Sequence, residues 1–305
     1  QRTRKTYTIT FKKNGGTGGL DTLTVEHGEK KDLIYGQRPS LNNCDFLGYY
    51  SEDGTQYFLS EGTGERPITQ NIELTARWGC GFYVQDVYVT SDNWDDILEN
   101  GGKVSYNPES NKLILNGASL VAEYKSASSK SAVVINKSRY PEFTIEVIGS
   151  DNTITNVSAN DAQKTRGISY EGGILKFIGS GTLTIDMRTG YCGDAIYLYD
   201  DWISYSEQQS KLVIDGPNII AIAGTAESIG FWNWGSGVVT ENIIVNSGSL
   251  LAAGLLAVSD YPNQGAEMIP TTQSGKTLII KASSTHATEA GNITEIVDAI
   301  TAGHQ

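Results

Sequence analysis

The chain has 305 residues, 35 of them acidic and 23 basic, which gives a net charge of −12. This charge disfavours nucleic acid and anionic membrane surfaces as partners, because both attract concentrated Lys and Arg. No run of about 18 apolar residues occurs, so we expect no membrane insertion.

The first eighty residues are predicted to form short strands separated by turns. Residues 6–11 (TYTITF) alternate apolar and polar side chains and precede an Asn-Gly-Gly turn at 14–16. A second alternating strand follows at 21–28, and 46–58 (FLGYYSEDGTQYF) predicts a hairpin with Asp53-Gly54 at its turn. Residues 71–78 (NIELTARW) close the set as a strand with Trp78 on its apolar face.

This stretch resembles the Listeria–Bacteroides repeat, the internalin-type B-repeat. The resemblance covers residues 6–78 and is carried by YTITF…NGG, FLGYYSEDG and LTARW. It departs from the family at Tyr49, where the family usually has Trp. The resemblance implies a small β-grasp-like domain, taken as residues 1–79, on a bacterial surface or secreted protein, and it implies no catalysis.

The chain has three widely separated cysteines, Cys44, Cys80 and Cys192, with no zinc spacing or disulfide framework. Cys44 and Cys80 could pair within the first domain and leave Cys192 single. The other interpretation is three partly buried thiols.

Residues 82–116 are expected to connect this domain to a second one and to cap it. Residues 83–90 predict a strand, and 92–99 predict a short helix with Gly101 just past its end. Residues 102–117 predict a hairpin that turns at Asn107-Pro108.

A repeat then dominates the chain up to about residue 283. Five segments share one pattern, in which a short alternating strand is followed by a Gly turn and a second strand. Their turn glycines are Gly117, Gly149, Gly179, Gly216 and Gly248, separated by 32, 30, 37 and 32 residues. A third short strand is expected in each interval, at 132–136, 167–170, 195–199, 229–232 and 254–258.

Three short strands in about thirty residues predict an all-β solenoid of five to six coils. Phe143, Ile145 and Val147 are then expected to point inward, and coils stack roughly 4.8 Å apart. Asn and Gly at the corners suit left-handed backbone, as expected at Asn152, Gly181, Asn218 and Gly248. A β-sandwich is the alternative, but the long-range self-similarity favours the solenoid.

The second domain, residues 80–305, resembles the parallel β-helix modules of bacterial secreted proteins, including carbohydrate-binding ones, and more remotely the pectate-lyase-like fold. The carrying features are DVYVTSDNWDDIL…VSYNPESNKLILNGASL and the recurring coils, over about 82–283. Residues 284–305 are expected to cap the far end. The resemblance supports architecture more than activity.

Two aromatic segments are the candidate binding surface. The corner segment DDWISYSEQQ (200–209) lengthens one coil, and GFWNWGSG (230–237) follows one coil later at the same phase. Alternation sends Ile196 and Leu198 inward and Tyr197 and Tyr199 outward. Exposed aromatic rings and nearby polar groups suit a saccharide, whereas burial of the tryptophans over the solenoid is the alternative. The candidate glycan-binding residues are Tyr197, Tyr199, Trp202, Tyr205, Phe231, Trp232, Asn233 and Trp234.

Acidic residues in the same coils suggest two further chemistries. Asp194, Asp200 and Asp201 are a candidate calcium site, since calcium prefers several oxygen ligands from loops; no other cofactor is expected. Polysaccharide cleavage would need paired carboxylates, or calcium with a basic residue. The candidates for cleavage are Asp186, Asp194, Asp200 and Asp201, with Arg166 and Arg188, although outward charges on a solenoid are usually only solvated.

Together these patterns predict a non-catalytic, extracellular bacterial protein of the cell surface or envelope. Its expected partner is a polysaccharide or host or cell-wall glycan, bound on the solenoid. A structural or protein-binding surface element is one alternative, and a β-helix lyase or hydrolase is another. The negative charge weighs against an acidic polysaccharide unless calcium bridges it.

Overall fold

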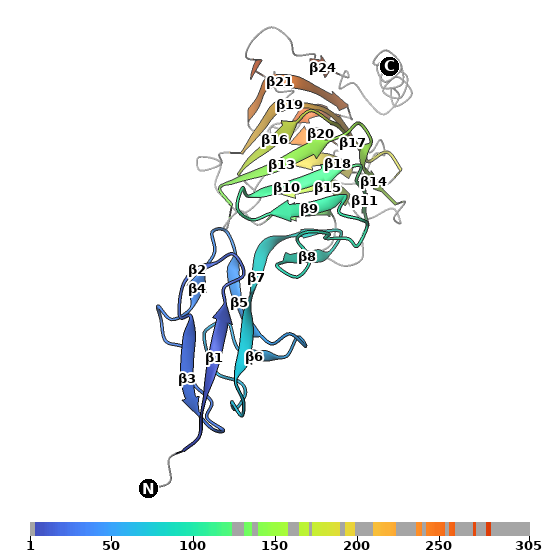
Figure 1. Cartoon of the computed structure of the whole chain (residues 1–305). Helices are drawn as coiled ribbons and strands as arrows, with labels where there is room; N and C mark the ends of the chain where they lie inside the picture. Colours follow the sequence, from blue (N-terminus) through green and yellow to red (C-terminus); the bar gives the residue numbers. More distant parts are fainter. Residues whose placement is uncertain are drawn as a thin grey trace, which may run out of the picture. The chain divides into compact units, whose positions relative to one another are not determined.

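The computed structural model describes residues 4–123, 131–135, 140–157, 165–170, 173–189, 193–198, 210–223, 236–239, 242–253, 256–259, 271–272 and 279–281. Within these ranges the chain is all-β, with curled sheets and no helix (Figure 1). None of this described part has a helix of the length and hydrophobicity needed to cross a bilayer.

The chain divides into two compact units. The first unit comprises Gln1–Gly81, Tyr88–Asp95 and Pro108–Ser110, and the second comprises Phe82–Val87, Asp96–Asn107 and Asn111–Gln305. The division after Gly81 lies close to the expected one after residue 79. The first unit also takes up 88–95, which the sequence placed in the cap of the second domain.

The first unit is built around a parallel pair formed by its first and last long strands (Figure 1). β1 lies between β3, to which it is antiparallel, and β7, to which it is parallel. β5 pairs antiparallel with both β7 and β6, and β2 pairs with β4. The strands are β1 (Thr6–Lys12), β2 (Thr17–Gly18), β3 (Thr22–Glu26), β4 (Pro39–Ser40), β5 (Asp45–Tyr50), β6 (Gln56–Phe58), β7 (Ile72–Val84) and β8 (Val87–Thr90).

Alternating side chains from these strands form the core of the first unit, as the sequence predicted. Ile9 and Phe11 of β1 and Leu74, Ala76 and Trp78 of β7 are at most 5% exposed, since successive side chains of a strand face opposite sides. Further buried members of this cluster are Val25, Leu33, Tyr49, Phe58 and Ile68.

The Asn-Gly-Gly turn is fixed by Trp78. The Trp78 indole N–H donates to the carbonyls of Lys13 (3.1 Å) and Asn14 (2.9 Å), and the Asn14 amide donates to the carbonyl of Ala76 (3.1 Å). A Cβ on Gly16 would lie 2.4 Å from the Trp78 ring. The turn and the closing Trp are therefore one packing unit.

The second unit is made of strands that pair in parallel with their counterparts about one repeat later. In one row, β10 (Lys112–Asn116), β13 (Glu142–Ile148), β16 (Ile174–Gly179), β19 (Lys211–Ile222) and β21 (Asn242–Ala253) follow one another. A second row contains β11 (Ser119–Ala122), β14 (Asn152–Asn156) and β17 (Thr182–Asp186), and continues through the later halves of β19 and β21. The short strands β23 (Thr271–Thr272) and β24 (Ile279–Lys281) both pair with β21.

A third row completes each repeat. It contains β12 (Ser131–Ile135), β15 (Thr165–Tyr170), β18 (Gly193–Tyr197), β20 (Ser236–Val239) and β22 (Leu256–Ser259), all paired in parallel. At one end the pairing becomes antiparallel, where β9 (Val104–Asn107) pairs with β10 and residues 82–84 of β7 pair with β12. The expected hairpin at 102–117 is therefore confirmed.

Equivalent buried residues of neighbouring strands lie side by side within each row and form an apolar stack. Every residue of these stacks is at most 2% exposed. The three stacks are Leu113–Ile145–Phe177–Ile214–Val245, Leu120–Ile154–Ile185–Ala221–Ala252 and Val133–Ile168–Ile196–Val238. All five predicted turn glycines have positive φ, between 65° and 123°.

The helix expected at 92–99 is wrong, because side chains bond to the backbone there. The Asn93 amide oxygen accepts from the Thr90 N–H (2.8 Å), and the Asp96 carboxylate accepts from the amides of Asn100 (2.9 Å) and Gly101 (3.0 Å). The Ile97 amide donates to the carbonyl of Val104 (2.9 Å) rather than within a helix. Asx-type bonds of this kind compete with helix formation, and the segment forms turns instead.

Two finer expectations about local structure also need correction. The strand expected at 83–90 is interrupted at Gln85 and Asp86, where φ is 46° and 66°. Asn152 lies within β14 rather than in left-handed backbone, and its side chain bonds to Ala118 and Thr182 in the neighbouring repeats. Of the other expected corners, Gly248 has the left-handed backbone (φ 79°), whereas Gly181 and Asn218 do not. The strand expected at 229–232 and the cap at 284–305 lie outside the described residues.

Candidate functional site

Most of the predicted aromatic surface cannot be located in the described part of the chain. Tyr197 and Asp194, both in β18, are described. The predicted site residues outside the described ranges are Tyr199, Asp200, Asp201, Trp202, Tyr205, Phe231, Trp232, Asn233 and Trp234. Their roles in glycan or calcium binding stay predictions.

The expectation that Tyr197 faces solvent is wrong, because its side chain is only 4% exposed. The prediction from alternation holds only where one face of a strand is exposed to solvent, whereas β18 is buried at every position. The Arg166 guanidinium carbon lies 3.4 Å from the centroid of the Tyr197 ring. The ring therefore covers a cation within the fold.

Arg166 also contacts Asp194, its register partner across β15 and β18. The Arg166 Nε lies 3.8 Å from Oδ2 of Asp194, whose side chain is fully buried. A buried carboxylate requires a nearby cation to offset its desolvation. Arg166 supplies that charge and links Asp194 to Tyr197, which gives both residues a role in holding β15 against β18.

Asp186 and Arg188, two other candidates for catalysis, form a bidentate ion pair. Arg188 donates through Nε (2.9 Å) and Nη2 (2.6 Å), and its backbone N–H adds a third bond (3.1 Å). Burial acts to raise the pKa of Asp186, but the hydrogen bonds from Arg188 outweigh it and leave the pKa below its usual range. A general acid needs a raised pKa instead.

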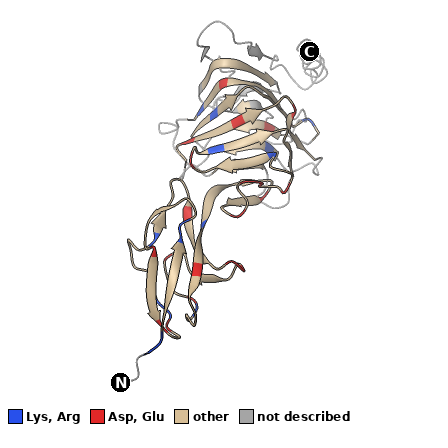
Figure 2. Cartoon of the chain, in the orientation of Figure 1, with Lys and Arg blue, Asp and Glu red and all other residues tan. Residues whose placement is uncertain are grey.

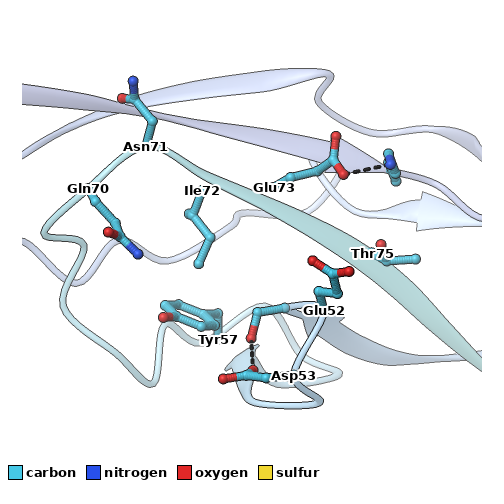
Figure 3. A pocket seen from close by; sticks show the side chains of 10 residues that line it. Glu52, Asp53, Tyr57, Gln70, Asn71, Ile72, Glu73 and Thr75 are labelled. Carbon is cyan, nitrogen blue, oxygen red and sulfur yellow. Dashed lines mark hydrogen bonds and ion pairs between the residues drawn. The ribbon is translucent and has the colours of Figure 1, made fainter.

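A groove in the first unit gathers polar side chains from three strands and has a volume of about 710 Å³ (Figure 3). β7 organises it, because β7 pairs with β1 on one side and with β5 on the other. The lining residues are Lys12, Ser51, Glu52, Asp53, Tyr57, Gln70, Asn71, Ile72, Glu73 and Thr75.

One wall of the groove is the turn between β5 and β6. The Ser51 hydroxyl donates to the Asp53 carboxylate (2.6 Å), which also accepts from the Thr55 N–H (3.0 Å). These hydrogen bonds, the one from Ser51 foremost, lower the pKa of Asp53. Gly54 supplies a positive φ of 82°, so the predicted Asp53-Gly54 turn is confirmed. The carboxylate of Glu52 points from this turn toward β7 (Figure 3).

The opposite wall is the start of β7 and the segment before it. The Asn71 side-chain oxygen accepts from the Thr8 N–H (3.0 Å), which fixes that segment to β1. Lys12 and Glu73 form an ion pair of 2.5 Å at the rim. Gln70 points toward Tyr57 and Ile72 (Figure 3), and the last two are half-buried against the core. The groove thus offers an aromatic ring, a primary amide and carboxylates over a small apolar floor.

The sequence did not reveal this groove, because its walls lie up to about sixty residues apart and meet only through strand pairing. Gln70 and Asn71 precede a strand whose alternation indicates only a core face. One sequence signal could have indicated the groove. The polar hairpin turn at 51–55 is followed closely by Tyr57, and the pairing of β5 with β7 would place this turn beside Ile72.

Charge does not single out another site in the described structure. Acidic and basic side chains are interspersed on both units in the view of Figure 2. Among the described residues, no three His, Cys, Asp or Glu side chains come together as metal ligands. Comparison with known proteins finds no family model, no curated protein and no solved structure that matches the chain.

Proposed function

We propose that the protein is a non-catalytic glycan-binding module of a bacterial surface or secreted protein. In this proposal the second unit is a parallel β-helix that serves as a platform, and the first is a Listeria–Bacteroides-type repeat. The parallel rows of the second unit and the stacked glycine turns support the β-helix. The order of YTITF…NGG and LTARW supports the repeat.

The observation that carries the binding proposal is the groove of the first unit. Saccharide sites combine a flat apolar surface with a few convergent polar groups. Tyr57 and Ile72 provide the apolar surface here, and Gln70 and Glu52 provide amide and carboxylate groups to bond hydroxyls. Three carboxylates against one lysine disfavour an anionic sugar. We therefore propose a neutral, hydroxyl-rich glycan as the ligand.

A titration of neutral oligosaccharides found by glycan-array screening tests this proposal. Tyr57→Ala and Gln70→Ala should each weaken binding at least tenfold in isothermal titration calorimetry. Tyr35→Ala is the matched control, because Tyr35 is 93% exposed on the same unit and does not line the groove. Equal affinity in the Tyr57 and Tyr35 variants would remove the groove as the site.

The aromatic segments of the second unit are the other proposed location. Trp202→Ala and Trp234→Ala should lower affinity if the glycan binds there, whereas the groove variants should not. The same titration with and without a calcium chelator tests the proposed calcium site at Asp194, Asp200 and Asp201. Affinity that is unchanged by chelation would argue against a bound calcium in recognition.

A protein-binding surface element is the second candidate function, and one turn favours it. Ile34 is 66% and Tyr35 is 93% exposed. Two hydrogen bonds close the turn, because the Ile34 N–H donates to the Gln37 side-chain oxygen and the Gln37 N–H donates to the Ile34 carbonyl (3.0 Å each). Two large side chains held in solvent by a fixed turn suit a partner protein. Loss of binding to a surface-protein partner in Tyr35→Ala, with glycan binding intact, would support this role.

A further inference from the structure

The sulfur atoms of Cys44 and Cys80 lie 3.6 Å apart. Cys44 directly precedes β5, and Cys80 lies in β7. The register pairs Asp45 with Gly79, so the next residues outward, Cys44 and Cys80, face each other across the two antiparallel strands. Opposed residues in an antiparallel pair have Cα atoms roughly 4.5–5.5 Å apart, which falls within the range that a disulfide spans.

The surroundings of the two cysteines suit reaction of one thiol with an oxidant, followed by formation of the disulfide with the other. Cys44 is half-buried, whereas Cys80 is buried. Cys44 also lies at the end of a tight turn, where its N–H donates to the Leu41 carbonyl (3.2 Å). A side chain at the end of a turn can rotate toward its partner with little change in the strand. Both groups belong to the first unit.

We propose that Cys44 and Cys80 form a structural disulfide when the protein meets a disulfide oxidant. The Cys44 thiolate attacks the oxidant disulfide and forms a mixed disulfide, releasing one oxidant thiol. The Cys80 thiolate then attacks the Cys44 sulfur and releases the second. One S–S bond forms in the protein and one breaks in the oxidant. Two electrons and two protons pass to the oxidant.

The bond would join the same two strands that carry the walls of the groove. β5 leads into the turn with Ser51 and Asp53, and β7 carries Ile72 and Glu73. Closing the chain between residues 36 apart in sequence also restricts the unfolded state. The proposal rests on the cysteine geometry alone and does not require that the groove bind a saccharide.

The test uses the full chain with Cys192→Ser, so that Cys44 and Cys80 are the two cysteines that remain. The protein is equilibrated in oxidised and reduced glutathione and then unfolded in the presence of a thiol-alkylating reagent. We expect no alkylation, an intact mass lower by two hydrogen atoms, and a proteolytic peptide that links Cys44 to Cys80. After treatment with dithiothreitol, two alkyl groups should be added.

Thermal unfolding supplies the second measurement. Oxidised Cys192→Ser protein should show a transition that is higher than in its reduced form by on the order of 10 °C. A protein that carries both Cys44→Ala and Cys192→Ser should be insensitive to dithiothreitol, and Cys44 is the residue changed because it is only half-buried. Two alkylated thiols after equilibration, glutathione attached to Cys44, or disulfide-linked dimers would each overturn the proposal.

Discussion

Tyr49 places its hydroxyl in the core of the first unit, where no described residue accepts or donates a hydrogen bond to it. Burying an unpaired hydroxyl costs free energy that a phenylalanine of the same shape avoids. We therefore expect Tyr49→Phe to raise the free energy of unfolding by about 1 kcal/mol. Tyr170→Phe is the control, since the Tyr170 hydroxyl donates to the Tyr140 carbonyl and its loss should destabilise. Urea denaturation of both variants measures the difference.

The same residue predicts an alkaline limit to stability. Burial, with a smaller contribution from Asp21, raises the pKa of Tyr49 to about 12. In the unfolded chain the phenol titrates near an ordinary pKa of about 10. Between those values the folded state holds a proton that the unfolded state has released, so stability falls as pH rises.

We expect the wild type to lose about 2 kcal/mol of stability over that interval from this group. Tyr49→Phe should lack this part of the loss. Melting temperatures recorded from pH 8 to about 12 compare the two proteins. Parallel curves would show that Tyr49 does not carry the effect.

In the second unit, Asn152 is a buried polar residue whose side chain bonds to the backbone of its own and of neighbouring repeats. Its side-chain oxygen accepts from the Ala118 N–H (3.0 Å), and its amide donates to the carbonyls of Ile148 (2.8 Å) and Thr182 (3.2 Å). Asn152 is 1% exposed and joins three successive repeats. Asn152→Ala should cost about 2–4 kcal/mol, because buried backbone groups lose their partners. Thr153→Ala, on the outer face, should cost less than about 1 kcal/mol.

At the scale of the element, the turn glycines set how closely successive repeats approach each other. A Cβ on Gly216, where φ is 123°, would lie 2.1 Å from the Gly179 carbonyl oxygen. Gly117 also has positive φ (65°), but the nearest atom to its Cβ would be 3.7 Å away. Both sites have a positive φ, which penalises alanine, and only Gly216 adds a clash with a neighbouring strand.

Gly117→Ala should therefore cost about 1–2 kcal/mol, the ordinary penalty of left-handed backbone. Gly216→Ala should cost clearly more, because the paired strands β16 and β19 must separate. Urea unfolding of the two variants in parallel tests this. Equal losses of stability would mean that the contact between Gly216 and Gly179 relaxes freely.

Comparison of the elements with the sequence shows which signals are sufficient. Alternation and the turn glycines are local signals, and they correctly predicted β10, β13, β16 and the positive φ of the five turn glycines. The prediction of a helix at 92–99 was wrong, because Asn93 and Asp96 bond to the backbone and the spacing of apolar residues does not reveal such bonds. The prediction that Tyr197 faces solvent was wrong, because burial of the second face of β18 depends on tertiary packing. The groove depends on strand order, which no local pattern encodes.

At the scale of the whole molecule, the first unit extends beyond its expected end. The Trp78 backbone exchanges hydrogen bonds with Ser91, through its N–H to the Ser91 hydroxyl (3.0 Å) and its carbonyl to the Ser91 N–H (2.9 Å). Arg77 and Asp92 add an ion pair of 3.0 Å. The segment 88–95 therefore bonds alongside β7, the strand that carries the core tryptophan.

We expect a fragment of residues 1–95 to melt at a higher temperature than a fragment of residues 1–79. Circular dichroism under reducing conditions makes the comparison independent of Cys80, which the shorter fragment lacks. Ser91→Ala in the longer fragment should lower its melting temperature part of the way toward that of the shorter fragment, because the hydroxyl that accepts from the Trp78 N–H is lost. Identical melting curves would show that 88–95 contributes nothing to the stability of the first unit.

The parallel register of the second unit has a consequence for how such a chain can change in length. β13, β16 and β19 each pair in parallel with the strand one repeat earlier and the strand one repeat later, and the stacked residues are apolar at every level. A duplicated repeat would meet the same kind of neighbours as the original. Gene duplication or deletion of whole repeats could therefore lengthen or shorten the molecule while the remaining levels keep their packing.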